Sequence, residues 1–464
     1  MFETVAVPVW AMVLIGVFAA LSILDRVIGP SIRWFFRKRA ERVVAELNKR
    51  LERPIEPFKL ARRFDMIQRL KYDPEVAQAI ADYAKSENVP HQVASEKAEH
   101  YAREIVPGFS ASAYFGFGTR AARWVSKALF DVRLGPGDDS VMDGIDPDAT
   151  VVFVMNHRSN MDYLLVTWLA AKRSALSYAV GEWARIWPLS ALIRTMGAFF
   201  IRRRHLNALY RKVLARYVQM ATDGGVTQAV FPEGGLSLDG QLAPLKLGFL
   251  SYVAAGQRPS GRDVVFVPVA LNYDRVLEDR VLIAAHSAGE RKFRAPIPTA
   301  LRFALRQFGH RLRGRFRRFG QAAVSYGAPL SLDEFARQHP EKTTDHLGAV
   351  LSERLAQIIP VLTVPLLASV LEDIDGTILR DTLRDRVANR HSTLLDAGAR
   401  VHVSAAALSD QVDAGVNMLI LRRVLTETGD GLAIASDKGA AVLAFYANSI
   451  RHLIKIEATS SGSN

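Results

Sequence analysis

The chain has 464 residues, 49% of them hydrophobic, which is enough for two or three domains and at least one large core. It contains no cysteine, so thiolate nucleophiles, disulfides and cysteine-based zinc sites are excluded. The formal net charge of +13 favours an anionic partner such as a phosphorylated metabolite, an acidic protein or a lipid surface. No motif that recognises bases accompanies this charge, so we expect no nucleic-acid partner.

Residues 5–24 form an uncharged apolar segment whose length is about the ~20 residues that a bilayer span requires. After it come the basic residues Arg33, Arg37, Lys38, Arg39 and Arg42. By the positive-inside rule this basic flank predicts that the rest of the chain lies in the cytoplasm. We therefore expect a membrane anchor helix at residues 1–30, and the alternative is a buried core helix.

Residues 31–135 predict a helical N-terminal region. In the segment "DPEVAQAIADYAKSEN", Asp73 is suited to cap a helix and Pro74 is suited to its first turn. Residues 134–148, "LGPGDDSVMDGIDPD", are rich in turn-forming residues and indicate a boundary.

Short apolar, β-branched runs alternate with helical periods beyond this boundary. The predicted strands are residues 150–155, 198–201, 226–231, 264–270 and 322–326. Such alternation predicts an α/β domain at residues 136–330, with a mixed, mostly parallel sheet flanked by helices. Residues 331–464 become helical again and predict a mainly helical C-terminal region. Ligands of parallel sheets gather at the carboxyl ends of strands, where His157 and Glu233 fall.

The first polar cluster, "NHRSNMD", directly follows the strand predicted at residues 150–155. His157 and Asp162 are five residues apart, so a regular helix would place them on different faces. A strand ending at Met155 and a helix beginning near Asn160 would form a bend that lets Asp162 face the imidazole. This arrangement predicts a histidine general base oriented by a carboxylate. A surface loop with a histidine and a helix-capping acid is the alternative.

Three further clusters end apolar runs. "GAFFIRRR" ends in three arginines, whose planar guanidinium groups suit phosphate, although a solvated charge run is the common explanation. "FPEGGLSLDG" carries Glu233 with Gly234 and Gly235, which would let the backbone approach a ligand closely. "VFVPVALNYDR" has Pro268 inside a strand-like run, which predicts an edge strand or a strand end.

In this order and spacing, the four clusters resemble the glycerolipid acyltransferases, and most closely the bacterial membrane-bound glycerol-3-phosphate acyltransferases. The motifs that carry the resemblance are "HRSNMDYLL", "GAFFIRR", "FPEGG", "PLKLG", "VPVALNYDRVLE", "VSYGAPLSL" and "YANSI". The resemblance covers about residues 105–371. It implies the glycerolipid acyltransferase fold and a location at the bacterial cytoplasmic membrane, with the catalytic domain on the cytoplasmic side.

The resemblance also implies single-step transfer of an acyl group from coenzyme A or acyl carrier protein to glycerol-3-phosphate, with neither a cofactor nor a metal. His157 would be the general base and Asp162 its orienting partner. The residues expected to bind substrate are Arg158, Ser159, Asn160, Arg202, Arg203, Glu233, Gly234, Gly235 and Lys246. No acyl-enzyme is needed, which agrees with the absence of cysteine and of a Gly-x-Ser-x-Gly motif.

The third cluster departs from the family at two positions. The family continues after its glycines with Arg-Ser-Arg, whereas this chain has Leu236-Ser237-Leu238. Either other cations, such as Arg203, Arg204 and Lys246, bind the phosphate, or the acceptor is different. A lysophosphatidate acyltransferase and a membrane-tethered lipid-binding protein with a decayed site are therefore kept as alternatives.

Residues 291–318 contain ten lysines or arginines and no acid, with phenylalanines among them. Basic groups next to aromatic rings suit an anionic phospholipid bilayer or an acidic carrier protein. A solvated helix whose phenylalanines belong to the core is the alternative.

Overall fold

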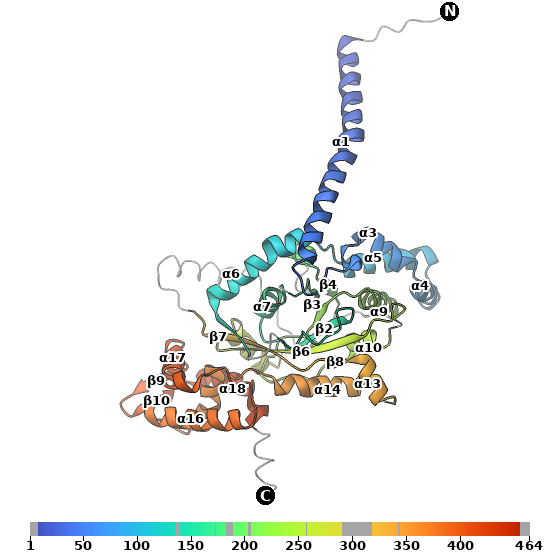
Figure 1. The fold of residues 1–464 in the computed structure, drawn as a ribbon. Helices are drawn as coiled ribbons and strands as arrows, with labels where there is room; N and C mark the ends of the chain where they lie inside the picture. The colour runs from blue at the N-terminus through green and yellow to red at the C-terminus, as the bar shows by residue number, and fades with distance from the viewer. Residues whose placement is uncertain are drawn as a thin grey trace, which may run out of the picture. The chain divides into compact units, whose positions relative to one another are not determined.

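The computed structural model describes residues 8–135, 140–171, 173–181, 189–202, 206–256, 258–289, 318–341 and 344–454. The chain divides into two compact units, Met1–Ile55 and Glu56–Asn464. The first unit contains the 40-residue helix α1 (Val9–Asn48) (Figure 1). The predicted membrane segment, residues 5–24, falls on the start of α1, and its first three residues lie outside the described part. No helix among the described residues combines the length and apolar character needed to cross a bilayer, so the prediction of a transmembrane helix is not supported.

The second unit begins with the predicted helices. They are α2 (Pro57–Leu60), α3 (Arg63–Lys71), α4 (Pro74–Ser86), α5 (His91–Ile105), the π-helix η1 (Ser112–Gly118) and α6 (Thr119–Leu129). The predicted cap is confirmed, because the side chain of Asp73 accepts hydrogen bonds from the backbone N–H groups of Glu75 and Val76 at 3.1 and 3.3 Å. Pro74 then occupies the first helical position, where a missing N–H has no cost.

The following sheet has eight strands in the order β1-β7-β6-β2-β5-β3-β4, with β8 paired to β6. The strands are β1 (Asp131–Leu134), β2 (Thr150–Met155), β3 (Ser177–Gly181), β4 (Phe199–Ile201), β5 (Gln228–Val230), β6 (Val264–Tyr273), β7 (Gln321–Tyr326) and β8 (Leu330–Ser331). All pairings are parallel except those of β6 with β7 and β8, which confirms the mixed, mostly parallel sheet. The five predicted strands are present, whereas β1, β3 and β8 lack the β-branched apolar run that would reveal them.

Pro268 lies in the middle of β6, and the prediction of an edge strand or strand end was wrong. Strand β6 pairs with β2 on one side, where Pro268 stands opposite Val154. On its other side β8 pairs as far as Phe266 and β7 begins at Val269, so Pro268 falls in the gap between two partners. Because proline lacks an N–H, it is tolerated in a central strand only at such a gap.

Alternate residues of β2 enter two different hydrophobic cores. Val151, Phe153 and Met155 pack into a core that includes residues of α7 (Met161–Ala170). Val152 and Val154 pack into a second core, which includes residues of α9 (Ala208–Asp223) and α10 (Gly248–Ala254). Burial on both faces explains the unbroken apolar run in the sequence, and it leaves the end of the strand as the place for polar residues.

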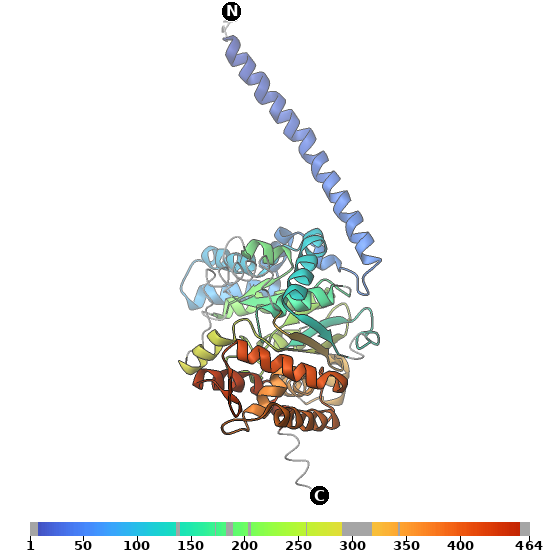
Figure 2. The ribbon, with the colours of Figure 1, turned by 90° about the vertical axis from the view of Figure 1, so that its left-hand side faces the viewer.

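The C-terminal part is mainly helical, as predicted, with one small hairpin that the sequence did not reveal. Its elements are α13 (Leu332–Gln338), α14 (Thr344–Gln357), α15 (Thr363–Leu371), α16 (Arg380–Asp396), η3 (Ala405–Ala407), α17 (Leu408–Leu421), β9 (Leu425–Thr428), β10 (Gly431–Ile434) and α18 (Asp437–Asn448). Every residue of α15 is buried. The helices α16, α17 and α18 lie together around it, coloured orange to red in Figures 1 and 2.

Candidate active site

The carboxyl ends of β2 and β5 meet at one edge of the sheet. The two strands are parallel neighbours, and Val154 of β2 is paired with Val230 of β5. The first polar cluster therefore leaves the sheet beside the third, which begins at Phe231. This register brings together two segments about 75 residues apart in the chain, as the α/β pattern predicts.

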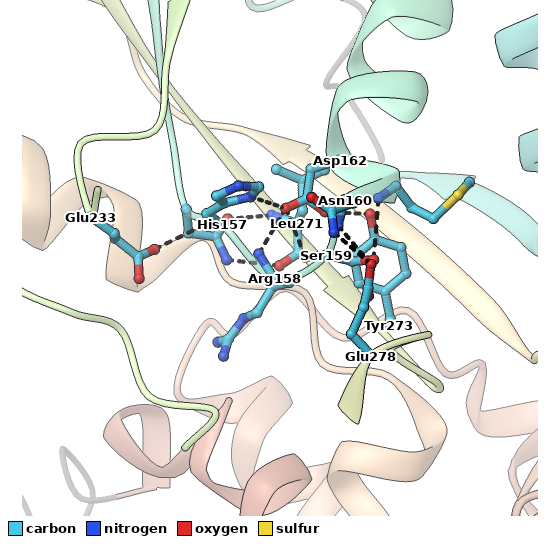
Figure 3. Close-up of polar contacts among 11 residues, drawn as sticks. His157, Arg158, Ser159, Asn160, Asp162, Glu233, Leu271, Tyr273 and Glu278 are labelled. Atoms are coloured by element: carbon cyan, nitrogen blue, oxygen red, sulfur yellow. Dashed lines mark hydrogen bonds and ion pairs between the residues drawn. The ribbon is translucent and has the colours of Figure 1, made fainter. Parts of the chain in front are cut away.

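His157 and Asp162 are in direct contact, as predicted. The chain turns after β2, and α7 begins at Met161, so that Asp162 lies in its first turn. Nδ1 of His157 lies 2.8 Å from Oδ2 of Asp162, and both side chains are buried (Figure 3). Because an ionised carboxylate only accepts hydrogen bonds, Nδ1 carries the proton and Nε2 is the nitrogen that can act as a base.

Backbone groups of the turn fix the same carboxylate. Oδ2 of Asp162 also accepts the N–H groups of Arg158 and Ser159, at 2.7 and 3.0 Å. The turn that follows β2 therefore wraps around Asp162 and cannot open without breaking these bonds. A carboxylate held by several N–H donors is a stable, pre-oriented partner for the imidazole.

Tyr273 is a member of this network that the sequence did not reveal. Its hydroxyl donates a hydrogen bond of 2.5 Å to Oδ1 of Asp162. Burial and the nearby Asp162 raise the pKa of Tyr273 well above its ordinary value, so the hydroxyl keeps its proton. Tyr273 ends β6, 111 residues after Asp162, and no local spacing indicates the contact.

Glu233 supports the loop of His157. Its Oε1 accepts the backbone N–H of His157 at 3.0 Å, and its Oε2 accepts that of Ala243 at 3.2 Å. Burial raises the pKa of this carboxyl. Glu233 was predicted to bind the acceptor, and the structure shows that both of its oxygens already bind backbone N–H groups.

Gly234 follows Glu233 in a left-handed conformation, with φ of +75°. A Cβ at this position would lie 2.5 Å from Nζ of Lys246, so a larger residue would displace the ammonium group from its present place. The backbone of Lys246 is fixed by its N–H, which donates to the carbonyl of Pro232 at 2.8 Å. The structure thus brings the predicted residues Gly234, Gly235 and Lys246 close to the histidine loop.

Arg158 points away from His157, as Figure 3 shows. Its buried guanidinium donates to the carbonyl oxygens of Gly240 and Ser449, the second at 3.4 Å. Because these bonds direct it into the protein interior, Arg158 is placed to link the loop after β5 to the end of α18. The predicted role of Arg158 in substrate binding has no support from this geometry.

Ser159 and Asn160 both bind Glu278, an acid that the sequence analysis missed. Ser159 Oγ donates to Oε2 of Glu278 at 2.8 Å, and Asn160 Nδ2 donates to Oε1 at 3.0 Å. Burial raises the pKa of Glu278. These contacts fasten the turn that follows β2 to the segment between β6 and α11 (Asp279–Ser287).

Arg202, which follows β4, has a partner of its own. Its Nε and Nη2 donate to the two carboxylate oxygens of Glu104 in α5, at 2.7 and 2.5 Å. The hydrogen bond with Glu104 raises the pKa of Arg202, and the guanidinium also lies over the rings of Tyr101 and Tyr210. Arg203 and Arg204 lie outside the described residues.

The imidazole of His157 lies in apolar surroundings. It stacks on Phe231 with ring centroids 4.2 Å apart and meets the edge of Tyr163 at 5.4 Å. Leu236 and Leu238 are partly buried against the same core. Over the described residues, no group of three or more His, Asp or Glu side chains is arranged to hold a metal ion.

Comparison with known proteins agrees with this geometry. Residues 140–272 match the acyltransferase family model, and residues 305–462 match the glycerol-3-phosphate acyltransferase C-terminal region. The glycerol-3-phosphate acyltransferases of Pseudomonas entomophila and Pseudomonas putida KT2440 are 27% and 28% identical over 426 residues. Over most of its length the chain is therefore similar to glycerol-3-phosphate acyltransferases. This finding confirms the resemblance that the four clusters predicted.

The alignments cover 86% of this chain and 49% and 50% of the two Pseudomonas proteins. The chain thus spans about half the length of the curated relatives it matches. Among solved structures, the 1-acyl-sn-glycerophosphate acyltransferase PlsC from Thermotoga maritima is 20% identical, with a TM-score of 0.32. That likeness covers 52% of this chain and 74% of the Thermotoga chain.

Proposed function

We propose that this protein transfers a fatty acyl group from a thioester to the 1-hydroxyl of glycerol-3-phosphate. The observation that carries the proposal is the buried pair of His157 and Asp162, held by Tyr273 at the carboxyl end of β2. This pair lies within the region that matches the acyltransferase family. The match to the glycerol-3-phosphate acyltransferase C-terminal region favours this acceptor over a lysophospholipid.

The proposed reaction has a single step of bond exchange. Nε2 of His157 takes the proton of the acceptor hydroxyl while its oxygen attacks the thioester carbonyl carbon. The new carbon–oxygen bond replaces the carbon–sulfur bond, and the leaving thiolate receives the proton from the imidazolium. Asp162 stabilises the positive charge that His157 carries between these two transfers. Neither an acyl-enzyme nor a cofactor is required.

The acceptor phosphate needs a cation near this base. Leu236 and Leu238 replace the arginines that the family has in the third cluster, and Arg202 is paired with Glu104. Lys246 is the cation that the structure holds beside Gly234, at the loop that Glu233 ties to His157. We infer that Lys246 contributes the main charge that binds the phosphate.

The acceptor is tested by assays of the purified full chain with glycerol-3-phosphate and with 1-acyl-glycerol-3-phosphate. Each acceptor is assayed in parallel with acyl-coenzyme A and with the acylated form of acyl carrier protein as the donor. We expect turnover with glycerol-3-phosphate. Activity with the lyso-lipid alone would make 1-acyl-glycerol-3-phosphate the acceptor and leave His157 as the base. Leu236 and Leu238 would then form an apolar wall for its acyl chain. Activity with neither acceptor would favour a lipid-binding protein.

We also propose that the protein acts on the cytoplasmic side of the bacterial cytoplasmic membrane, against anionic phospholipids. Support comes from Phe117 and Trp124, which are 63% and 60% exposed and lie seven residues apart. Arg120, Arg123 and Lys127 lie among and beyond them in the sequence. Exposed aromatic rings beside basic groups suit a bilayer interface. Because α6 packs against α7, this surface is near the helix that carries Asp162.

Vesicle sedimentation tests this surface. Replacing Phe117 and Trp124 by alanine should weaken binding to vesicles that contain phosphatidylglycerol, because less apolar area would enter the interface. The same replacement of the exposed Leu379 and Leu395 serves as the control for lost apolar area. Equal binding of the parent and both variants would exclude the surface of η1 and α6 as a membrane contact.

A further inference from the structure

Five arginines converge on one hollow of the second unit, which we name the arginine hollow. They are Arg275, Arg280, Arg318, Arg422 and Arg423. The hollow has a volume of about 840 Å³ and is lined by the segment after β6, by α11 and by the end of α17. Its lining brings together residues almost 150 positions apart in the chain. Arg275 ends the fourth sequence cluster and Arg318 ends the basic segment at residues 291–318, but neither pattern indicated the hollow.

The hollow contains more positive charge than its own acid can balance. Its single lining carboxylate, Asp279, is an ion-pair partner of Arg422 and accepts a hydrogen bond of 2.6 Å from Tyr446. Among the described residues, no carboxylate lies within 4 Å of the guanidinium groups of Arg275, Arg318 or Arg423. Within the part of the chain that the structure describes, the hollow therefore holds five arginines with one lining carboxylate.

The surroundings of these arginines add to the free-energy cost of holding them together. Burial lowers the pKa of Arg275, and the charge of Arg422 lowers it further, while the guanidinium lies 4.3 Å from the ring centroid of Phe319. Arg423 has a left-handed backbone, with φ of +57°, a conformation usually given to glycine at the end of a helix. The dipole of α17 favours cations at its C-terminus, but it does not explain why Arg275, Arg280 and Arg318 converge there.

The hollow is connected to the candidate active site by one short segment. Glu278 binds Ser159 and Asn160 in the turn that carries His157, and the next residue, Asp279, lines the hollow. A ligand in the hollow would therefore contact the residue next to the one that binds this turn. A thioester donor with a distant charged end, joined to its sulfur by a long arm, has the required shape.

We propose that the arginine hollow binds the phosphorylated nucleotide end of coenzyme A when the acyl-thioester donor is bound. The inference rests on the proposed acyl transfer. Guanidinium groups bind phosphate oxygens in pairs, and coenzyme A carries a pyrophosphate and a ribose phosphate. A concave site of this volume is typical for small molecules, whereas the acidic helices of a carrier protein would need an open basic face. The site thus selects coenzyme A over acyl carrier protein.

The test uses the full chain with Arg318 and Arg423 both replaced by glutamine. These two side chains are exposed and donate no hydrogen bond to a described residue, so their loss should leave the fold intact. A matched control replaces Arg386 and Lys438, two exposed cations of α16 and α18, by glutamine. Both variants lose two positive charges. A difference between them therefore reports on the hollow and not on the net charge of the protein.

We expect the hollow variant to weaken coenzyme A binding, measured by calorimetry, by about tenfold or more. Its KM for palmitoyl-coenzyme A should rise equally, with kcat unchanged, while its KM for palmitoyl-pantetheine, which has no nucleotide, should stay the same. The control variant should match the parent in each measurement. An unchanged affinity for coenzyme A would overturn the proposal, as would a KM that rises for palmitoyl-carrier protein alone.

The binding measurement separates this inference from the proposed function. If the parent binds coenzyme A, the hollow variant binds it more weakly and neither forms product, the proposed reaction fails and the nucleotide site stands. If the parent uses palmitoyl-carrier protein as the donor but does not bind coenzyme A, the proposed reaction stands and the inference of a nucleotide site is wrong.

Discussion

The end of β2 and the end of β4 differ in what their polar residues contact, although both follow short buried strands. After β2, His157 and Asp162 join a network that also contains Glu233, which follows β5, and Tyr273, which ends β6. After β4, Arg202 binds Glu104 and lies over two tyrosine rings. One strand end is therefore built into a shared site, and the other is tied to a helix.

The position of each strand in the sheet accounts for this difference. Strand β2 has β5 and β6 as direct neighbours, so three polar segments leave the sheet side by side. Strand β4 is the last strand of the sheet, separated from β2 by β5 and β3. The same kind of motif therefore has different surroundings, and the order of strands decides which polar residues can act together.

Removal of the base at the end of β2 should have the largest effect. His157→Ala should lower the rate of acyl transfer by about 10²–10⁴-fold, because no group would take the proton of the attacking hydroxyl. The measurement is release of free thiol from acyl-coenzyme A that depends on glycerol-3-phosphate. The exposed His91 provides a matched histidine-to-alanine control. Turnover of His157→Ala within a few-fold of the parent would remove this residue from the mechanism.

Lys246, near the end of β2, and Arg202, after β4, should differ in their effect on the KM for glycerol-3-phosphate. Lys246→Met should raise the KM for glycerol-3-phosphate by about tenfold or more, because a charge-assisted phosphate contact contributes roughly 1.5–3 kcal/mol. Arg202→Met should mainly lower the melting temperature, because Glu104 loses both hydrogen bonds from Arg202.

Glu104→Gln distinguishes the two roles of Arg202. If Arg202 only stabilises the structure, this variant should leave the KM for glycerol-3-phosphate unchanged. If Arg202 leaves Glu104 to bind phosphate, the variant should lower that KM, and Arg202→Met should raise it as much as Lys246→Met does. The second pattern would make the two strand ends parts of one site.

The smallest expected effect concerns the pH dependence of stability. Burial raises the pKa of Glu233 above its ordinary value of 4.5, so the folded protein binds this proton more readily than the unfolded chain. The contribution of Glu233 to stability is therefore complete below pH 4.5 and decreases as the pH rises through the raised pKa. Glutamine does not titrate. The melting temperature of Glu233→Gln minus that of the parent should therefore increase as the pH rises from 4.5 to 7.5.

The exposed Glu341 provides the control for the same substitution, and Glu341→Gln should follow the parent at each pH. A constant difference between Glu233→Gln and the parent across this range would show that the charge of Glu233 carries no cost in the folded protein.

The sequence predicted what is local to the strand ends. The pair of His157 and Asp162 could be predicted because one bend joins them, and β2 could be predicted because both its faces are buried. Tyr273, Glu278 and Glu104 could not, since each meets its partner about 100 residues away along the chain and carries no spacing signal.

Long-range packing also explains the prediction that was wrong. Pro268 was expected at an edge because the change of partner from β8 to β7 cannot be seen in one strand. Arg158, which the resemblance implied as a substrate-binding residue, has backbone carbonyls of distant segments as its partners, and no local pattern indicates them. The first polar cluster indicated where the site lies, and long-range packing decided what each of its side chains does.

The buried guanidinium of Arg158 also sets a limit on how this protein can be divided. It binds carbonyls of Gly240 and Ser449, and Ser449 also accepts a hydrogen bond of 3.2 Å from Asn272 at its hydroxyl. A fragment restricted to residues 140–272 would lack Ser449 and leave a buried cation with fewer acceptors, which is a large penalty for a small domain. The segment matched as an acyltransferase is thus a unit of homology, whereas we expect the unit that folds to extend at least to Ser449.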